Sequence, residues 1–177
     1  MKRFLLRMNP AQRKLAQIKV ELTRRRAAPG RPTREGLGAV FLRAWETVPM
    51  RRRPAFFASA LSINVVLVSD AEIAKLNAKH MRHNGATDVL SFPIGEIDPE
   101  RRAFHLGEVV ASFETAQREA KARGIPVTEE VTRYCVHGFL HCIGYDDTTP
   151  AKRRAMSVVQ ERALKAFFSR KEAKRKS

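Results

Sequence analysis

The chain has 177 residues and two cysteines, and its 34 Lys and Arg against 18 Asp and Glu give a formal net charge of +16. This length suits one domain with its own core, and two cysteines are too few for a disulfide framework, so we expect Cys135 and Cys142 inside the core of a protein from a reducing compartment. The start is not typical of a secretory signal and the most apolar stretch, residues 56–68, is too short to span a bilayer, which favours a cytoplasmic protein without membrane contact.

The first part of the chain predicts a helix start, a segment that stays ambiguous, and then a helix. Asn9 and Pro10 are typical of a helix start, with Asn as the cap and Pro at the first helical position. The apolar residues within 15–22 fit either a helix or an edge strand, and both readings stay open. Thr33 can cap a helix that runs to about Val48 with one apolar face.

The middle of the chain predicts three strands and one short helix. Residues 61–68 are rich in β-branched side chains and predict a strand, after which Ser69 can cap a short helix. A second strand is expected over 88–92 and should stop at Pro93, because proline cannot donate to a strand ladder. Residues 106–112 predict a third strand.

The last part of the chain predicts three helices. Residues 113–123 fit a helix that Gly124 closes, and Thr128 begins the helix that carries two histidines. Thr149 and Pro150 start a final helix that continues into a basic tail. Strands and helices interleave around a small mixed sheet without repeats, which predicts a single α+β domain, with α/β as the alternative.

The positive charge is concentrated at the two ends of the chain. Residues 1–53 hold 15 Lys and Arg against 3 Asp and Glu, and residues 151–177 hold 10 against 2. Residues 54–150 instead hold 9 against 13. Basic segments of this kind are typical of phosphate-contacting elements, although they also occur as solvated surface, so the pattern favours a polyanion partner.

A metal site is predicted where the histidine helix ends. His137 and His141 lie four residues apart, so both imidazoles project from one helix face and can reach a single divalent ion. Gly144 suits a C-cap, which lets the chain turn back and offer Asp146 or Asp147 as a third ligand. Three protein ligands with one open position describe a catalytic zinc site; two incidental histidines on a capped helix are the alternative.

The spacing His-x3-His-x5-Asp also matches the metzincin proteases. Those enzymes place a glutamate directly after the first histidine as general base, whereas this chain has Gly138. A protease would therefore lack its base, which makes this the less favoured interpretation.

The segment from His137 to Asp147 closely resembles the signature H-G-x-L-H-x-x-G-Y-D-H of the YbeY endoribonuclease family, with Asp147 in place of the last histidine. The resemblance covers residues 61–168 and is specific as an ordered set. Further blocks match in the same order: L-N at 76–77, T-D-V-L-S-F-P at 87–93, L-G-E-V-V at 106–110, and Met156 with Glu161 in the trailing helix.

The resemblance implies an α+β domain with one zinc ion per chain, bound in a cleft by His137, His141 and Asp147. We expect a basic N-terminal extension and helix over residues 1–60, the YbeY-like domain over 61–168, and a basic tail over 169–177.

Within the T-D-V-L-S-F-P block, we expect Thr87, Asp88 and Ser91 to contact the substrate. The family has an arginine between its L-N and T-D-V-L-S-F-P blocks, with a role in stabilising phosphate. This position falls on Met81 in this chain, and the adjacent Arg82 is expected to point in a different direction.

The function that follows is a metal-dependent endoribonuclease for single-stranded RNA, acting in maturation of the 3′ end of small-subunit ribosomal RNA and in ribosome quality control. Its expected partners are ribosomal RNA and the small ribosomal subunit. The alternatives are a ribosome-associated assembly factor with a mainly structural metal and, less favoured, a metzincin-like protease.

Overall fold

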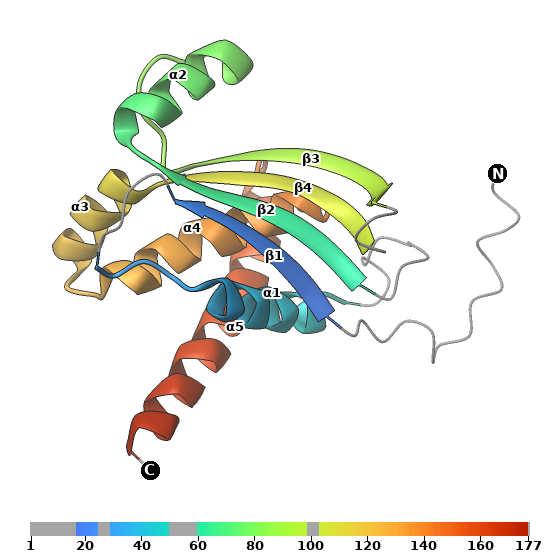
Figure 1. Cartoon of the computed structure of the whole chain (residues 1–177), viewed down its shortest axis with the longest axis vertical. Helices are drawn as coiled ribbons and strands as arrows, with labels where there is room; N and C mark the ends of the chain where they lie inside the picture. Colours follow the sequence, from blue (N-terminus) through green and yellow to red (C-terminus); the bar gives the residue numbers. More distant parts are fainter. Residues whose placement is uncertain (1–16, 25–28, 50–59, 99–102, 177) are drawn as a thin grey trace, which may run out of the picture.

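A computed structural model describes residues 17–24, 29–49, 60–98 and 103–176; the helix start expected at Asn9 and Pro10 lies outside the described residues. Four strands form one sheet in the order β1-β2-β4-β3 (Figure 1). β1 and β4 run parallel to β2, whereas β3 is antiparallel to β4, which confirms a small mixed sheet in a single α+β domain. The strands are β1 Gln17–Arg24, β2 Ala60–Val68, β3 Val89–Asp98 and β4 Ala103–Ser112.

The described helices are α1 Arg34–Thr47, α2 Asp70–Met81, α3 Phe113–Arg123, α4 Val127–Cys142 and α5 Pro150–Lys176. Helices α1, α3, α4 and α5 lie on one side of the sheet, and α2 lies on the other (Figure 1). The main core fills the space between the sheet and the four helices, where the rings of Phe41 and Phe139 stack at 4.8 Å. A smaller cluster beneath α2 contains Ile73, Leu90 and Val110. Within the described part of the chain, no helix is both long and apolar enough to cross a membrane.

The predicted helix ends are confirmed where a side chain or glycine defines them. The Thr33 hydroxyl accepts the amide of Gly36 at 3.0 Å at the start of α1. Ser69 and Glu72 form a reciprocal capping box at the start of α2, in which each side chain accepts the other's amide. α3 ends at Gly124, which takes the left-handed conformation.

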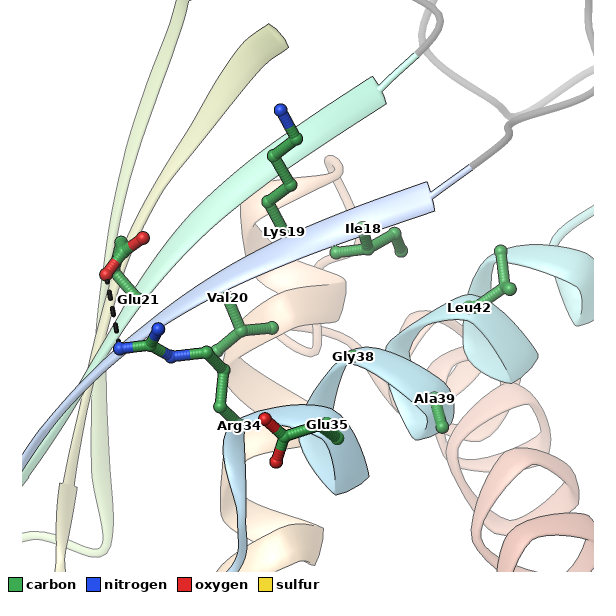
Figure 2. Close-up of a pocket in the computed structure, with 9 residues that line it drawn as sticks. All are labelled: Ile18, Lys19, Val20, Glu21, Arg34, Glu35, Gly38, Ala39 and Leu42. Atoms are coloured by element: carbon green, nitrogen blue, oxygen red, sulfur yellow. Dashed lines mark ion pairs between the residues drawn. The ribbon is translucent and has the colours of Figure 1, made fainter. Parts of the chain in front are cut away.

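From residue 17, where the described residues begin, the ambiguous segment forms an edge strand. β1 pairs in parallel with β2 over its whole length, and Ile18 and Val20 are buried against the core. α1 lies against this strand so closely that a Cβ on Gly38 would meet the carbonyl oxygen of Ile18 at 3.2 Å. Figure 2 shows the shallow groove between β1 and α1, with the ion pair of Glu21 and Arg34 at 3.5 Å along it.

The prediction that Pro93 stops its strand is wrong, because β3 continues through Pro93 to Asp98. β3 is an edge strand and its pairing with β4 shifts between Pro93 and Glu96, so the proline occupies a bulge on an edge, where its missing N–H leaves no ladder position unfilled. β4 correspondingly begins at Ala103, ahead of the expected start at Leu106.

α4 is held by a buried acidic residue in its first turn. The helix begins one residue before Thr128, whose hydroxyl does not cap it but donates to the Gly30 carbonyl at 2.8 Å. The fully buried Glu130 carboxylate lies 3.2 Å from Arg123 and 3.4 Å from Arg133. This buried charge is paired with two guanidinium groups and fixes the end of α4 opposite the histidines.

The starts of α2 and α3 are joined by the carboxylate of Asp70. It accepts hydrogen bonds from the hydroxyls of Ser112 and Thr115, and it pairs with Arg118 at 2.5 Å. Partial burial alone would raise the pKa of Asp70, but these three donors outweigh it and lower that pKa. The Glu114 carboxylate accepts the Asp70 amide at 2.8 Å, so α2 is fixed relative to the sheet.

Candidate metal centre

The end of α4 turns the chain back over its own histidines. The Tyr145 amide donates to the carbonyl of Leu140 and the Gly144 amide to that of His141, each at 2.9 Å. With Gly144 at φ 91°, these bonds form a Schellman motif, which confirms the predicted glycine cap. The reversal brings Asp147 beside the two imidazole rings.

Three donor groups converge at this point. The Nε2 atoms of His137 and His141 lie 3.2 Å apart, and the Asp147 carboxylate oxygens lie 3.7 Å from the first and 4.0 Å from the second. Ligands bound to zinc at about 2.0–2.1 Å in tetrahedral geometry are separated by about 3.4 Å. The three groups could therefore hold one metal ion after small side-chain adjustments.

Hydrogen bonds at the Nδ1 atoms of the two imidazole rings direct the Nε2 lone pairs toward the space between the rings and Asp147. The Nδ1 atom of His141 lies 3.0 Å from the carbonyl oxygen of Tyr145, and that of His137 lies 3.1 Å from the amide oxygen of Gln160. Both oxygens are acceptors, so each Nδ1 carries the proton and each Nε2 is left with its lone pair. Two lone pairs facing each other beside a carboxylate form an electron-rich set that suits a cation.

Gln160 is a site residue that the sequence prediction missed. It lies on α5, in the turn that follows the buried Met156 and directly after the buried Val159. The sequence did offer one signal for it, because Gln160 is a polar residue at the border of the apolar face of an amphipathic helix.

The structure separates the two acidic residues that follow Gly144. The Asp146 carboxylate is turned toward the start of α5, where it accepts from the Lys152 amine at 2.6 Å and from the amide and hydroxyl of Thr148 at 2.8 and 3.0 Å. The bond from Lys152, followed by those from Thr148, lowers the pKa of Asp146. Asp146 therefore braces the turn, and Asp147 is the carboxylate beside the histidines.

The donors open into a cleft of about 530 Å³ between α4 and β3. The predicted contact residues Asp88 and Ser91 line it, whereas Thr87 stands behind Asp88 and donates to its carboxylate at 3.0 Å. Met81 lines the cleft from the end of α2; Arg82 is exposed at the C-cap and is not among the lining residues. The full lining is Met81, Asp88, Val89, Leu90, Ser91, Pro93, His137, His141, Tyr145 and Asp147.

Close packing explains the glycine after the first histidine. A Cβ on Gly138 would lie 2.6 and 2.9 Å from the two methyl groups of Val109 and 3.0 Å from the hydroxyl of Ser91. The helix thus lies directly on the sheet at this position and has no room for the glutamate that a metzincin protease uses as its base.

The chain is similar to known proteins in sequence and in fold. The family model described as endoribonuclease YbeY matches residues 45–168, which is well over half of the chain. The chain belongs to the YbeY family. The residues matched include the histidine helix, the turn that carries Asp147 and the strand β3 that lines the cleft.

Curated relatives named endoribonuclease YbeY include proteins from Anaeromyxobacter dehalogenans and Myxococcus xanthus. The first is 43% identical over 113 residues, covering 61% of this chain and 58% of the relative; the second is 38% identical over 109 residues, covering 60% and 36%. The chain thus spans little more than half, or less, of the length of these YbeY relatives. A solution structure from Thermotoga maritima shares the fold, with a TM-score of 0.54 and 22% identity over 89% of this chain and 93% of that one.

Proposed function

We propose that the chain is a zinc-dependent endoribonuclease that cleaves single-stranded RNA and acts in maturation of the 3′ end of small-subunit ribosomal RNA. The observation that carries the proposal is the convergence of His137, His141 and Asp147 in an open cleft, in a chain of the YbeY family. Three protein ligands leave a coordination position for a reacting group, which is typical of catalytic zinc sites.

The residues of the cleft have distinct roles in this proposal. His137, His141 and Asp147 would hold a divalent ion, which when bound would polarise a phosphoryl oxygen and make bound water more acidic. The Ser91 hydroxyl can donate to a phosphate oxygen in the cleft. The Asp88 carboxylate accepts hydrogen bonds from the amide of Val89 at 2.8 Å and from the hydroxyl of Thr87. These bonds fix its orientation, in which it can also accept a hydrogen bond from a ribose hydroxyl.

The basic ends supply the affinity for the RNA backbone. Residues 54–150, which contain the cleft, hold more acidic than basic side chains, so long-range attraction to RNA must come from the flanks. α5 begins three residues after Asp147 and carries exposed basic side chains along its length: Lys152, Arg153, Arg154, Arg162, Lys165 and Arg170. Binding through these side chains should weaken as salt rises, because counterions are released from the RNA.

A tail deletion tests this part of the proposal. Removal of residues 169–177 should leave the fold intact, weaken RNA binding and flatten its dependence on salt concentration. The buried residues nearest to the cut, Ala163 and Leu164, lie outside the deleted segment. RNA binding with an unchanged salt slope would place the recognition surface elsewhere on the chain.

Ribosomal RNA and the small ribosomal subunit are the proposed partners, and the cytoplasm the proposed location. The family name supports an RNA substrate. A ribosome-associated assembly factor with a mainly structural metal is the second candidate, since the cleft presents Met81 where the family signature has an arginine.

Cleavage with and without metal separates the two candidates. Wild-type protein should cut single-stranded ribosomal RNA, and a chelator should abolish cleavage while circular dichroism shows a folded protein. His137→Ala should lose cleavage, whereas His83→Ala, at an exposed histidine outside the cleft lining, should retain it. Unfolding on chelation, or no cleavage by the folded wild-type protein, would favour the assembly factor with a structural metal. Equal cleavage by His137→Ala would refute a metal-dependent active site at His137.

A further inference from the structure

The Gln160 side chain is oriented by groups on both of its ends. Its amide nitrogen donates to the Glu161 carboxylate at 3.3 Å, and its amide oxygen lies 3.1 Å from Nδ1 of His137. A carboxylate accepts only, so the NH₂ end of the amide must face Glu161 and the oxygen must face the imidazole. The oxygen in turn requires the proton of His137 to be on Nδ1, which leaves Nε2 to bind a metal.

Glu161 is itself held by the helix that carries the histidines. It forms an ion pair with Arg133, which lies one helical turn before His137 on α4. The Arg133 side chain is only 19% exposed and also contacts the buried Glu130. A continuous set of polar contacts therefore runs from the buried start of α4, across to α5 and back to His137.

We propose that Gln160 is a positioning residue for the metal centre, which fixes the tautomer and the ring orientation of His137 and is itself oriented by the Glu161–Arg133 ion pair. This inference rests on the metal site of the proposed function. The tautomer and ring orientation of His141 are fixed in the same way by the backbone carbonyl of Tyr145, which no substitution can remove. Gln160 is therefore the point at which a side chain controls the ligand set.

The neutral amide also sets the strength of the ligand. An amide oxygen accepts the Nδ1 proton without a full charge, whereas a carboxylate in the same place would draw that proton more strongly and make Nε2 more basic. Gln160→Glu keeps an acceptor and adds charge, while Gln160→Ala removes the acceptor. The two variants therefore should change the metal affinity in opposite directions.

Zinc affinity, measured by competition with a chromogenic chelator, tests the proposal on the full chain. Gln160→Ala should bind zinc about 10–100-fold more weakly, as removal of a group behind a metal-binding histidine typically does. Gln160→Glu should bind zinc more tightly than wild type. Glu161→Ala should weaken zinc binding by less than Gln160→Ala. The Gln160 amide is still present in this variant, but without Glu161 it is free to rotate and exchange the positions of its oxygen and its NH₂ group. Val158→Ala, at a 48% exposed residue of the same helix, is the matched control and should bind as wild type does.

Nuclear magnetic resonance of the zinc-loaded protein supplies a second readout that a general loss of stability would not reproduce. The Nδ1 proton of His137 should exchange slowly with solvent in wild type and Gln160→Glu and faster in Gln160→Ala, while the Nδ1 proton of His141 stays protected in all three. Unchanged zinc affinity in folded Gln160→Ala, or an unchanged exchange rate at His137, would overturn the inference. Wild-type protein that binds no zinc would instead refute the proposed function.

Discussion

Replacement of Gly138 by alanine should destabilise the protein, although the same change in most helices is stabilising. In a helix interior, alanine is favoured over glycine by about 1 kcal/mol. Here the added methyl group would meet both methyls of the buried Val109 and the hydroxyl of Ser91 at 2.6–3.0 Å, distances that require the helix or the strand to move. Overpacking of this kind costs about 1–3 kcal/mol, and three simultaneous contacts favour the upper part of that range, so we expect a net loss of about 1–2 kcal/mol.

Urea unfolding followed by circular dichroism measures this free energy of unfolding, provided that the denaturant slope is unchanged. Val109→Ala makes room for the new methyl group, so the double variant should be less destabilised than the sum of the two single variants. Gly138→Glu, which would introduce the base of a metzincin protease, should not fold stably. A Gly138→Ala protein more stable than wild type would refute the close approach of α4 to the sheet.

Three further outcomes follow from the site and its supports. Asp147→Ala should weaken zinc binding more than Asp146→Ala in competition with a chelator, because only Asp147 lies beside the imidazoles; the reverse order would reassign the third ligand. Asp70→Asn should lower the stability at neutral pH, and since the folded-state pKa of Asp70 is lowered from 3.8, the difference between the two proteins should shrink as pH falls below 3.8; a constant difference in acid would contradict the role of the charge. Burial raises the pKa of the Cys135 and Cys142 thiols to about 12, so both should resist iodoacetamide at pH 8 until the protein is unfolded.

The features of the fold that the sequence predicted correctly are mostly those that depend on neighbouring residues. The caps at Thr33 and Ser69 and the stop at Gly124 depend on residues within one helical turn, and the structure has all three. The segment 15–22 stayed ambiguous because its apolar residues fit two periodicities, and only the pairing of β1 with the distant β2 decides for a strand. Pro93 was mistaken for a stop because its tolerance depends on the edge position of β3, which the local sequence does not encode.

The candidate site divides in the same way. The spacing of His137 and His141 and the turn at Gly144 are local, so the sequence alone could indicate a metal site there. The contact of Gln160 with His137 joins residues 23 apart and exists only because α5 docks against α4. The need for glycine at position 138 also depends on tertiary structure, because it arises from how closely α4 lies on β4.

Titration of zinc into the metal-stripped protein, with cleavage of a single-stranded ribosomal RNA fragment as the readout, tests the link between the cleft and the proposed activity most directly. We expect no cleavage by the stripped protein, and an activity that rises in proportion to added zinc and levels off at one ion per chain. His141→Ala should show no such rise at the same zinc concentrations. Cleavage that persists after the metal is removed, or its absence when one zinc ion per chain is bound, would contradict a ribonuclease built on His137, His141 and Asp147.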